Sequence, residues 1–392
     1  MPLCSYADAP VIIFYNRRTV TILSSADSSL ATATGLLSLD IENFRNIERA
    51  SLSFSSTTNL ITGPNAAGKT SLLEAIYCLG RVRSFRTLDA NQLIREGHPS
   101  YRLVGKIGLT AGRMIPIGME RFQGHYRIHL EGRMVQKLSD LAGCFPVQIM
   151  TSDTVNILNG GPGYRRQSMD WALFHVEQGY RLLWQRYTRI LRQRNAALRA
   201  HAPLGQITVW DREFADAAES LDRLRRAYLA DLEPYIQNEL ESLLPDKSLS
   251  LRYLSGWSKD VELQVALKKA FEKDRTHGFT HCGPHRADIV LLVDGRPVQT
   301  NFSRGQQKAM ILAFMMGQVK MQHALNAPRG VLLVDDLGSE LDKEHQSRIL
   351  LCLREIGVQV FVTAIDAHAD HLAEWPMMKR FHVKHGEVRE VL

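Results

Sequence analysis

The chain has 392 residues, of which 45% are hydrophobic, and a formal net charge of +7. This length supports a large hydrophobic core divided over two or three lobes. Charged residues interrupt every apolar run before about 18 residues, so the sequence predicts no membrane-spanning helix. The moderate positive charge favours a polyanionic partner, although many other classes of protein share it.

Five cysteines are scattered along the chain without a paired spacing. This pattern predicts reduced thiols in a cytoplasmic protein rather than a disulfide framework. One stretch, "HCGPHRAD", contains four residues that could form half of a zinc site, and no second Cys/His pair with a matching spacing accompanies it. Zinc is therefore the less favoured interpretation of His281, Cys282, His285 and Asp288.

Residues 1–36 differ in composition from the rest of the chain and are rich in small polar residues. In "VIIFYNRRTV" the arginines follow the apolar run, whereas in a secretory signal the positive charges precede it. We interpret this segment either as an N-terminal tail or as the result of a start codon assigned too far upstream. The packed domain is expected to begin near Leu37.

A loop of the pattern G-x-x-x-x-G-K-[ST] follows a short apolar run, Asn59–Thr62. The run predicts a buried strand, and the segment after the loop has the spacing of a helix that starts near Lys69. Glycines at both ends of the loop allow its N–H groups to turn inward and bind anions, beside the positive end of the helix. The predicted ATP-binding residues are Gly63, Pro64, Asn65, Ala66, Ala67, Gly68, Lys69, Thr70 and Ser71. Lys69 would contact the β- and γ-phosphates and contribute to catalysis, and the Thr70 hydroxyl would bind Mg²⁺.

An acidic pair comes directly after a second apolar run, Val331–Val334. Such a run is typical of a parallel strand buried on both faces, and ligands bind at the carboxyl ends of these strands. We predict that Asp335 holds Mg²⁺ through its coordination shell and that Asp336 is the catalytic residue that orients or deprotonates the attacking water. More than half of the chain separates Lys69 from this pair, which indicates a large insertion between two halves of one ATPase.

A third motif, "FSRGQQK", precedes a helix that is apolar on most faces and is therefore expected to be buried. Ser303 is a good N-cap for this helix, and a capped helix start is a further anion site. Because the phosphate-binding loop already surrounds one side of the triphosphate, we predict that this second helix start reaches the γ-phosphate from another subunit. ATP would then hold a dimer together, and hydrolysis would release it.

The order of these three motifs resembles an ABC-type ATPase head, and more narrowly the chain resembles the RecF family. The matching stretches run in the family's order over residues 37–392: "LDIENFRNI", "GPNAAGKTSLLEAIYCLG", "RSFRT", "RRQSMDWALFHVE", "GPHRAD", "SRGQQK" and "DDLGSELD". The residues before this span have no counterpart in the family. The resemblance implies an α/β fold in which a mostly helical inserted subdomain splits the ATPase head.

The resemblance also implies ATP-dependent dimerisation, slow ATP hydrolysis that serves as a switch, and binding of duplex DNA and its junctions with single strands. It implies work with RecR and RecO that promotes RecA loading in repair and replication restart. Carried over to this sequence, Ser303, Gly305 and Gln306 would contact ATP in trans, Asp342 would lie at the D-loop and Gln92 would be the Q-loop residue. Two departures from a generic ABC head agree with slow hydrolysis: Asp336 replaces the usual glutamate, and Thr363 and Asp366 stand where many ABC ATPases have a switch histidine.

The predicted organisation is a tail (1–36), an ATPase lobe (37–150), a helical arm (151–280) and a second ATPase lobe (281–392). The apolar residues of Tyr180–Arg199 share one helical face, and five arginines lie on the other with no acidic residue from 179 to 209. This basic face is either a contact with DNA phosphates or an ordinary solvated surface. A DNA contact made by the ATPase lobes is an equal alternative. Breaks at "HAPLG" and "LLPDKS" predict short antiparallel helices rather than a long coiled coil.

The same ATP motifs also occur in other ABC-type machines. An SMC-like protein would separate the motifs by a long heptad repeat, which is absent here. The ATPase subunit of a membrane transporter would have a shorter spacing between the loop and the "SRGQ" motif, and "GPHRAD" has no role in it. An ATP-gated nuclease would need a cluster of carboxylates in an added domain, and the sequence has none.

Overall fold

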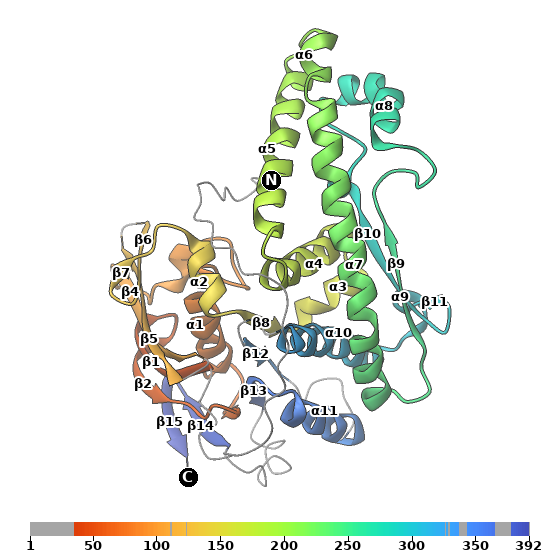
Figure 1. Cartoon of the computed structure of the whole chain (residues 1–392). Helices are drawn as coiled ribbons and strands as arrows, with labels where there is room; N and C mark the ends of the chain where they lie inside the picture. The colour runs from red at the N-terminus through yellow and green to blue at the C-terminus, as the bar shows by residue number, and fades with distance from the viewer. Residues whose placement is uncertain are drawn as a thin grey trace.

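The computed structural model describes residues 35–109, 112–122, 124–325, 327, 330–336, 343–364 and 378–391. Figure 1 shows a base that contains two large β-sheets and a tall helical arm that rises from one side of it. The predicted fold class is confirmed, because the base is a P-loop α/β head and the arm is inserted within its sequence.

The central sheet of the base has the strand order β15-β14-β3-β13-β12-β8 and is parallel except for its β14–β15 hairpin. Its inner strands are apolar because both of their faces are covered. Along β12, Val331 and Leu333 face one core, and Leu332 and Val334 face the other. The strands are β3 (Thr58–Thr62), β8 (Val147–Met150), β12 (Val331–Val334), β13 (Gln359–Ala364), β14 (Lys379–Lys384) and β15 (Glu387–Val391).

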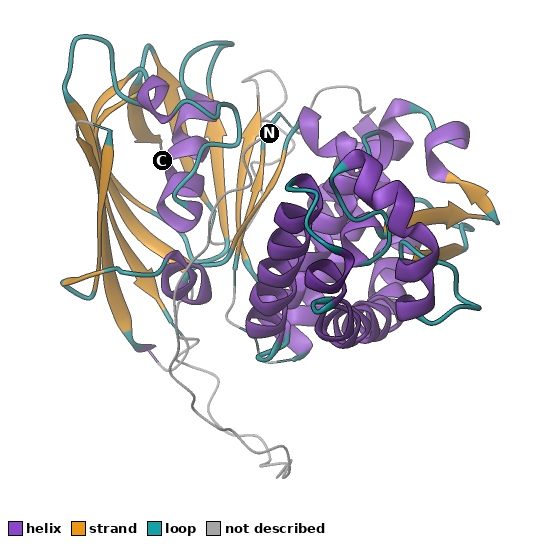
Figure 2. Ribbon diagram, turned by 90° about the horizontal axis from the view of Figure 1, so that it is seen from above, coloured by secondary structure: helices purple, strands orange, loops and turns teal. Residues whose placement is uncertain are grey.

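The second sheet is antiparallel with the order β2-β1-β4-β5-β6-β7. Helix α1 (Lys69–Arg81) packs between this sheet and the central sheet, and Figure 2 shows helices between the two sheets from above. The side chain of Gln359 joins the two sheets through the backbone N–H and carbonyl of Leu36. The other elements of this lobe are β1 (Gly35–Phe44), β2 (Ile47–Ser53), β4 (Ser100–Gly108), β5 (Met114–Phe122), β6 (His125–Leu130), β7 (Arg133–Met134), α2 (Leu138–Cys144) and a 3₁₀ helix, Ala90–Leu93.

The arm consists mainly of two helices that run side by side in opposite directions, α5 (Tyr180–Arg199) and α7 (Asp211–Leu243). They end at the two breaks that the sequence predicts, and short α6 (Leu204–Thr208) connects them at the tip. The remaining helices on this side are α3 (Asn156–Asn159), α4 (Pro162–Val176), α8 (Leu263–His277) and α9 (Val298–Asn301).

A small antiparallel sheet, β11-β10-β9, lies beside the arm. Its strands are β9 (Leu249–Leu254), β10 (Asp288–Val293) and β11 (Arg296–Pro297). Because β10 pairs with β9 along its whole length, residues 288–293 lie with the arm and not in the central sheet. The division of the chain at residue 281 stays a prediction, and this pairing favours a boundary nearer α10 (Arg304–Ala324).

Helix α10 connects the arm to the base. At Gly317 a Cβ atom would lie 2.8 Å from Cγ1 of Ile236 and 2.9 Å from its backbone nitrogen, so the absent side chain allows α7 to cross α10 closely. Helices α10 and α11 (Lys343–Glu355) cover the central sheet on the side opposite α1. The arm therefore packs directly on the helix that begins with the "SRGQ" motif.

Buried ion pairs hold the base of the arm together. Arg165 of α4 donates to both carboxylate oxygens of Asp288 at 2.7 and 3.1 Å, and also to the carbonyls of residues 157, 158 and 160. Arg225 of α7 donates to Asp170 and to the Pro284 carbonyl. The stretches "RRQSMDWALFHVE" and "GPHRAD" thus meet in one network. In the described part of the chain, no helix is long and apolar enough to cross a bilayer.

Candidate functional site: a phosphate-binding loop and an acidic pair

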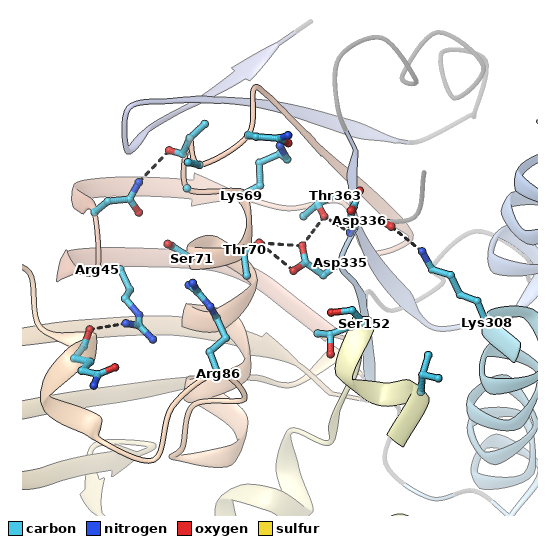
Figure 3. A pocket seen from close by; sticks show the side chains of 18 of the residues that line it. Arg45, Lys69, Thr70, Ser71, Arg86, Ser152, Lys308, Asp335, Asp336 and Thr363 are labelled. Atoms are coloured by element: carbon cyan, nitrogen blue, oxygen red, sulfur yellow. Dashed lines mark hydrogen bonds between the residues drawn. The ribbon is translucent and has the colours of Figure 1, made fainter. Parts of the chain in front are cut away.

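A cavity of about 1330 Å³ opens at the carboxyl ends of the central strands and contains most of the predicted site residues. Asn65 to Ser71, Gln92, Asp335 and Asp336 line it, and the carbonyls of Gly63 and Pro64 accept from Lys69 Nζ at 2.6 and 3.0 Å. Figure 3 shows Lys69 and Thr70 on the loop side and Asp335 and Asp336 at the end of β12. Strand pairing brings these two halves together, because β13 lies between β3 and β12.

The loop that precedes α1 needs glycine at both ends. Gly63 has a φ of 143°, and a Cβ atom there would lie 2.2 Å from the Val383 carbonyl oxygen. Gly68 has a φ of 120°, and its Cβ would lie 2.8 Å from the side chain of Asn46. The backbone angles predicted from the sequence are therefore confirmed, and the packing of the neighbouring segments adds a second reason for these glycines.

The Thr70 hydroxyl donates to the two carboxylate oxygens of Asp335 at 3.2 and 3.0 Å. Thr363, a buried residue of β13, donates to the same carboxylate at 2.7 Å. Hydroxyl and carboxylate oxygens are the ligands that Mg²⁺ prefers. The donor set around Asp335 therefore suits a magnesium ion held by one carboxylate, one hydroxyl and the phosphates of a nucleotide.

The backbone N–H and the backbone carbonyl of Asp336 both form hydrogen bonds with side chains. Its N–H donates to the Thr363 hydroxyl at 2.7 Å, and its carbonyl accepts from Lys308 Nζ at 2.9 Å. The residue has a φ of 53°, in the left-handed region, which a side chain other than glycine adopts only at a cost. These two contacts stabilise that conformation and leave the Asp336 side chain exposed at the edge of the cavity.

Two arginines on the cavity wall were not predicted as site residues. Arg45 donates through Nε and Nη2 to Glu74, both at 2.8 Å, and Arg86 lies 3.5 Å from the same carboxylate. Glu74 is fully buried in α1, so it fixes the position of both cations. Arg45 also donates to the Gln92 carbonyl at 2.8 Å. Glu74 interrupts the apolar run "LLEAIYCLG", and this charged residue was the sequence feature that could have indicated a cationic partner for a buried carboxylate.

The "SRGQ" motif forms the start of α10. Ser303 is the N-cap: its hydroxyl accepts from the Gln306 N–H, while the Gln306 side chain accepts from the Ser303 N–H. Ser303, Gly305 and Gln306 are not among the residues that line the cavity of their own chain, whereas Arg304, Gln307 and Lys308 are. Asp342 and Asp366 lie outside the described residues.

The alternative zinc site is not formed as a cluster. His281 contacts Asp274, His285 bridges the Tyr187 hydroxyl and the Thr280 carbonyl, and Asp288 binds Arg165. Within the ranges that the structure describes, no group of three or more His, Cys, Asp or Glu residues is arranged to hold a metal ion. The "GPHRAD" stretch has a structural role here.

Two of the five arginines on the basic face of α5 lie near acidic residues of other elements. Arg186 pairs with Glu213 of α7 at 3.1 Å, and Arg181 approaches Asp140 of α2 at 4.0 Å. These acidic residues come from other elements, so the helix alone could not reveal them. Arg189, Arg192 and Arg199 remain exposed on this face.

A phosphate-binding loop lies beside the acidic end of a second parallel strand of the same sheet, and a capped helix packs under an inserted helical arm. This arrangement defines an ATPase head of the ABC type. The chain matches the family described as "RecF/RecN/SMC N terminal domain" over residues 35–387. It is 38% identical to the "DNA replication and repair protein RecF" of Nitrosococcus oceani, over 90% of this chain and 98% of that protein, and 38% identical to that of Thioalkalivibrio sulfidiphilus with the same coverage. The chain therefore belongs to the RecF family.

Solved structures agree with this assignment. One described as "Structure of the recombination mediator protein RecF-ATP in RecFOR pathway" superposes with a TM-score of 0.81 at 25% identity, over 92% of this chain and 99% of that one. An Smc head bound to the C-terminal winged-helix domain of ScpA superposes with a TM-score of 0.58 at 13% identity, over 91% of this chain and 97% of that one, which shows a shared fold alone.

Proposed function

We propose that this protein is an ATP-driven DNA-binding switch of recombinational repair and replication restart. Two copies bind ATP and Mg²⁺ between them and hold gapped or duplex–single-strand junction DNA in the cytoplasm. Slow hydrolysis then separates the copies. RecO and RecR are the proposed partners and RecA loading the proposed outcome. The names of the relatives and the words "RecF-ATP" and "RecFOR pathway" attached to a similar structure support this proposal.

The observation that carries the proposal is the orientation of the start of α10. Lys69, Thr70 and Asp335 surround one cavity, but Ser303, Gly305 and Gln306 of the same chain do not line it. The helix dipole and the N–H groups left unpaired at a helix N-terminus favour binding of anions. These three residues are thus available to the nucleotide of a second copy, and the nucleotide becomes part of the dimer contact.

When a nucleotide and Mg²⁺ are bound, the metal neutralises charge on the transferred phosphate. Of the chain's own residues, Lys69 would contact the β- and γ-phosphates, and Thr70 and Asp335 would hold the metal. Asp336 would orient or deprotonate the attacking water. Its aspartate side chain is one methylene shorter than the glutamate common in ABC-type ATPases, which favours slow turnover.

The test compares wild type, Lys69→Ala and Ser303→Arg by light scattering with ATP and Mg²⁺, and by nucleotide titration. We expect Lys69→Ala to lose nucleotide binding and dimerisation together, and Ser303→Arg to keep nucleotide affinity within about threefold while losing the dimer. Equal loss of both properties in Ser303→Arg would place this residue in its own chain's site. A wild-type protein that stays monomeric with ATP would overturn the switch.

A further inference from the structure

The first turn of α10 presents two different faces. Arg304, Gln307 and Lys308 are spaced three and four residues apart, so they share one side of the helix, and all three line the nucleotide cavity of their own chain. Ser303, Gly305 and Gln306 do not line this cavity, and the surface that they form is called the outer face. The inner face, formed by Arg304, Gln307 and Lys308, therefore adjoins the site of its own chain.

Lys308 makes the contact between the inner face and the acidic pair. It is 7% exposed in a helix that is otherwise largely apolar, and its Nζ donates to the Asp336 carbonyl at 2.9 Å. A lysine is costly to bury without a partner. In Figure 3 its side chain extends from α10 towards the strand end that carries Asp336.

We propose that Lys308 is a positioning residue for Asp336, and that through it α10 adjusts the hydrolytic site of its own chain when its outer face engages the nucleotide of the other copy. This inference rests on the proposed function. A shift of α10 moves the Lys308 ammonium group, and this changes how firmly the left-handed main chain of Asp336 is held between Lys308 and Thr363. Each of the two sites in a dimer would then respond to occupation of the other.

The position of α10 is further constrained by a second contact beside the cavity. Asn159 at the end of α3 donates to the Gln307 side chain at 2.8 Å. Arg165, which binds Asp288, also donates to the carbonyls at this end of α3. The inner face of α10 is thus connected on one side to the acidic pair and on the other to the base of the arm.

The first experiment uses Lys308→Met and Lys308→Arg, with Lys320→Met as the matched control. Lys320 lies on the same helix but pairs with Glu239, away from the cavity. We expect Lys308→Met to lower kcat for ATP at least tenfold with KM within about twofold, Lys308→Arg to recover at least a third of the rate, and Lys320→Met to match wild type.

A second readout needs neither nucleotide nor dimer. Hydrogen exchange of the Asp336 amide, which donates to Thr363, should become at least tenfold faster in Lys308→Met and stay unchanged in Lys320→Met. An unchanged exchange rate together with an unchanged kcat would overturn the proposal. If Lys308→Met does not fold, Lys308→Arg is compared with Lys308→Gln. A packing role would give the two variants the same kcat and the same Asp336 exchange rate. The positioning role predicts a higher kcat and slower exchange in Lys308→Arg.

Mixed dimers test whether Lys308 acts within its own chain. The reference is a dimer of one wild-type and one Asp336→Asn chain. Placing Lys308→Met on the Asp336→Asn chain should leave the rate of this reference unchanged, and placing it on the other chain should lower the rate at least tenfold. The reverse pattern would show that Lys308 acts across the dimer and would overturn the proposal. Failure of the wild-type protein to dimerise would instead count against the proposed function, and the exchange measurement would still report on Lys308.

Discussion

Thr70 and Asp335 lie 265 positions apart in the sequence, yet the hydroxyl of one donates to both carboxylate oxygens of the other. The contact exists because β13 pairs with both β3 and β12, so the loop after β3 and the acidic pair after β12 meet at one edge of the sheet. The whole arm is inserted in the sequence between these two partners.

This contact predicts that ATP affinity no longer depends on Mg²⁺ once Asp335 is replaced. In wild type, Mg²⁺ should raise ATP affinity at least tenfold, because Thr70 and Asp335 provide oxygen ligands beside the phosphates. Asp335→Asn should bind ATP with nearly the affinity that wild type has in EDTA. The adjacent Asp336→Asn should keep the magnesium effect and lose turnover. Isothermal titration with and without EDTA measures both, and an intact magnesium effect in Asp335→Asn would contradict the assignment.

The close approach of Val383 to the loop predicts that Gly63→Ala will disrupt nucleotide binding. The added Cβ would lie 2.2 Å from the Val383 carbonyl oxygen, so the loop or β14 must move. We expect ATP affinity to fall at least tenfold. Gly295→Ala is the matched control, since Gly295 also has a positive φ, of 75°, but nothing within 4 Å of its Cβ position. Equal ATP affinity in the two variants would show that the close approach does not matter.

The exposed arginines of α5 predict a phosphate contact that can be measured through salt. Arg189→Glu combined with Arg192→Glu should weaken DNA binding at least tenfold and reduce the slope of log K against log salt by about 2, since each lost phosphate contact removes about 0.9. Lys268→Glu with Lys269→Glu on α8 makes the same change in net charge. A similar loss in both double variants would indicate a net-charge effect, and an unaltered slope would identify α5 as a solvated surface.

His285 predicts a loss of stability in mild acid. Burial lowers the pKa of its imidazole to about 4, from an ordinary value of about 6.5. Between these values the unfolded chain binds a proton that the folded chain does not, so the free energy of unfolding falls as the pH drops through this window and is constant above it. Denaturant titrations from pH 7.5 to 4.5 should show this fall.

The variant His285→Gln should remove part of the pH dependence of the free energy of unfolding. A remainder is expected, because burial lowers the pKa of His175 to about 3, which acts in the same direction. The control is His277→Gln on the exposed end of α8, which should leave the slope unchanged. If His285→Gln retained the full wild-type slope, the neutral contact with Tyr187 and Thr280 would have no role in acid stability.

The nucleotide loop and the acidic pair could be predicted because each is a local pattern with a fixed geometry. A short apolar strand followed by a glycine-bounded loop leaves few backbone paths, and Val331–Val334 forms the strand that its apolar run predicts. The ends of α5 and α7 were likewise visible in the sequence, as proline and glycine breaks.

The contacts between distant segments could not be predicted in the same way. Lys308 belongs to the "SRGQQK" stretch, but its partner is a backbone carbonyl 28 positions away. A main-chain acceptor has no sequence pattern. The sequence of α5 suggests a helix face with positive charges alone, but Glu213 of α7 pairs with Arg186 on that face. Sequence periodicity describes the face of a helix, but it does not describe what other elements bring to that face.

The crossing of α7 over α10 at Gly317 has a mechanical consequence. Helix α7 has 33 residues and a proline, Pro234, two positions before the crossing residue Ile236. The part from the crossing to the tip is about 38 Å long at 1.5 Å per residue, so a tilt of about 5° at Gly317 would carry the tip roughly 3 Å. Small rotations about this crossing, on the helix whose N-cap is Ser303, would therefore be enlarged into displacements of several ångström at the tip of the arm.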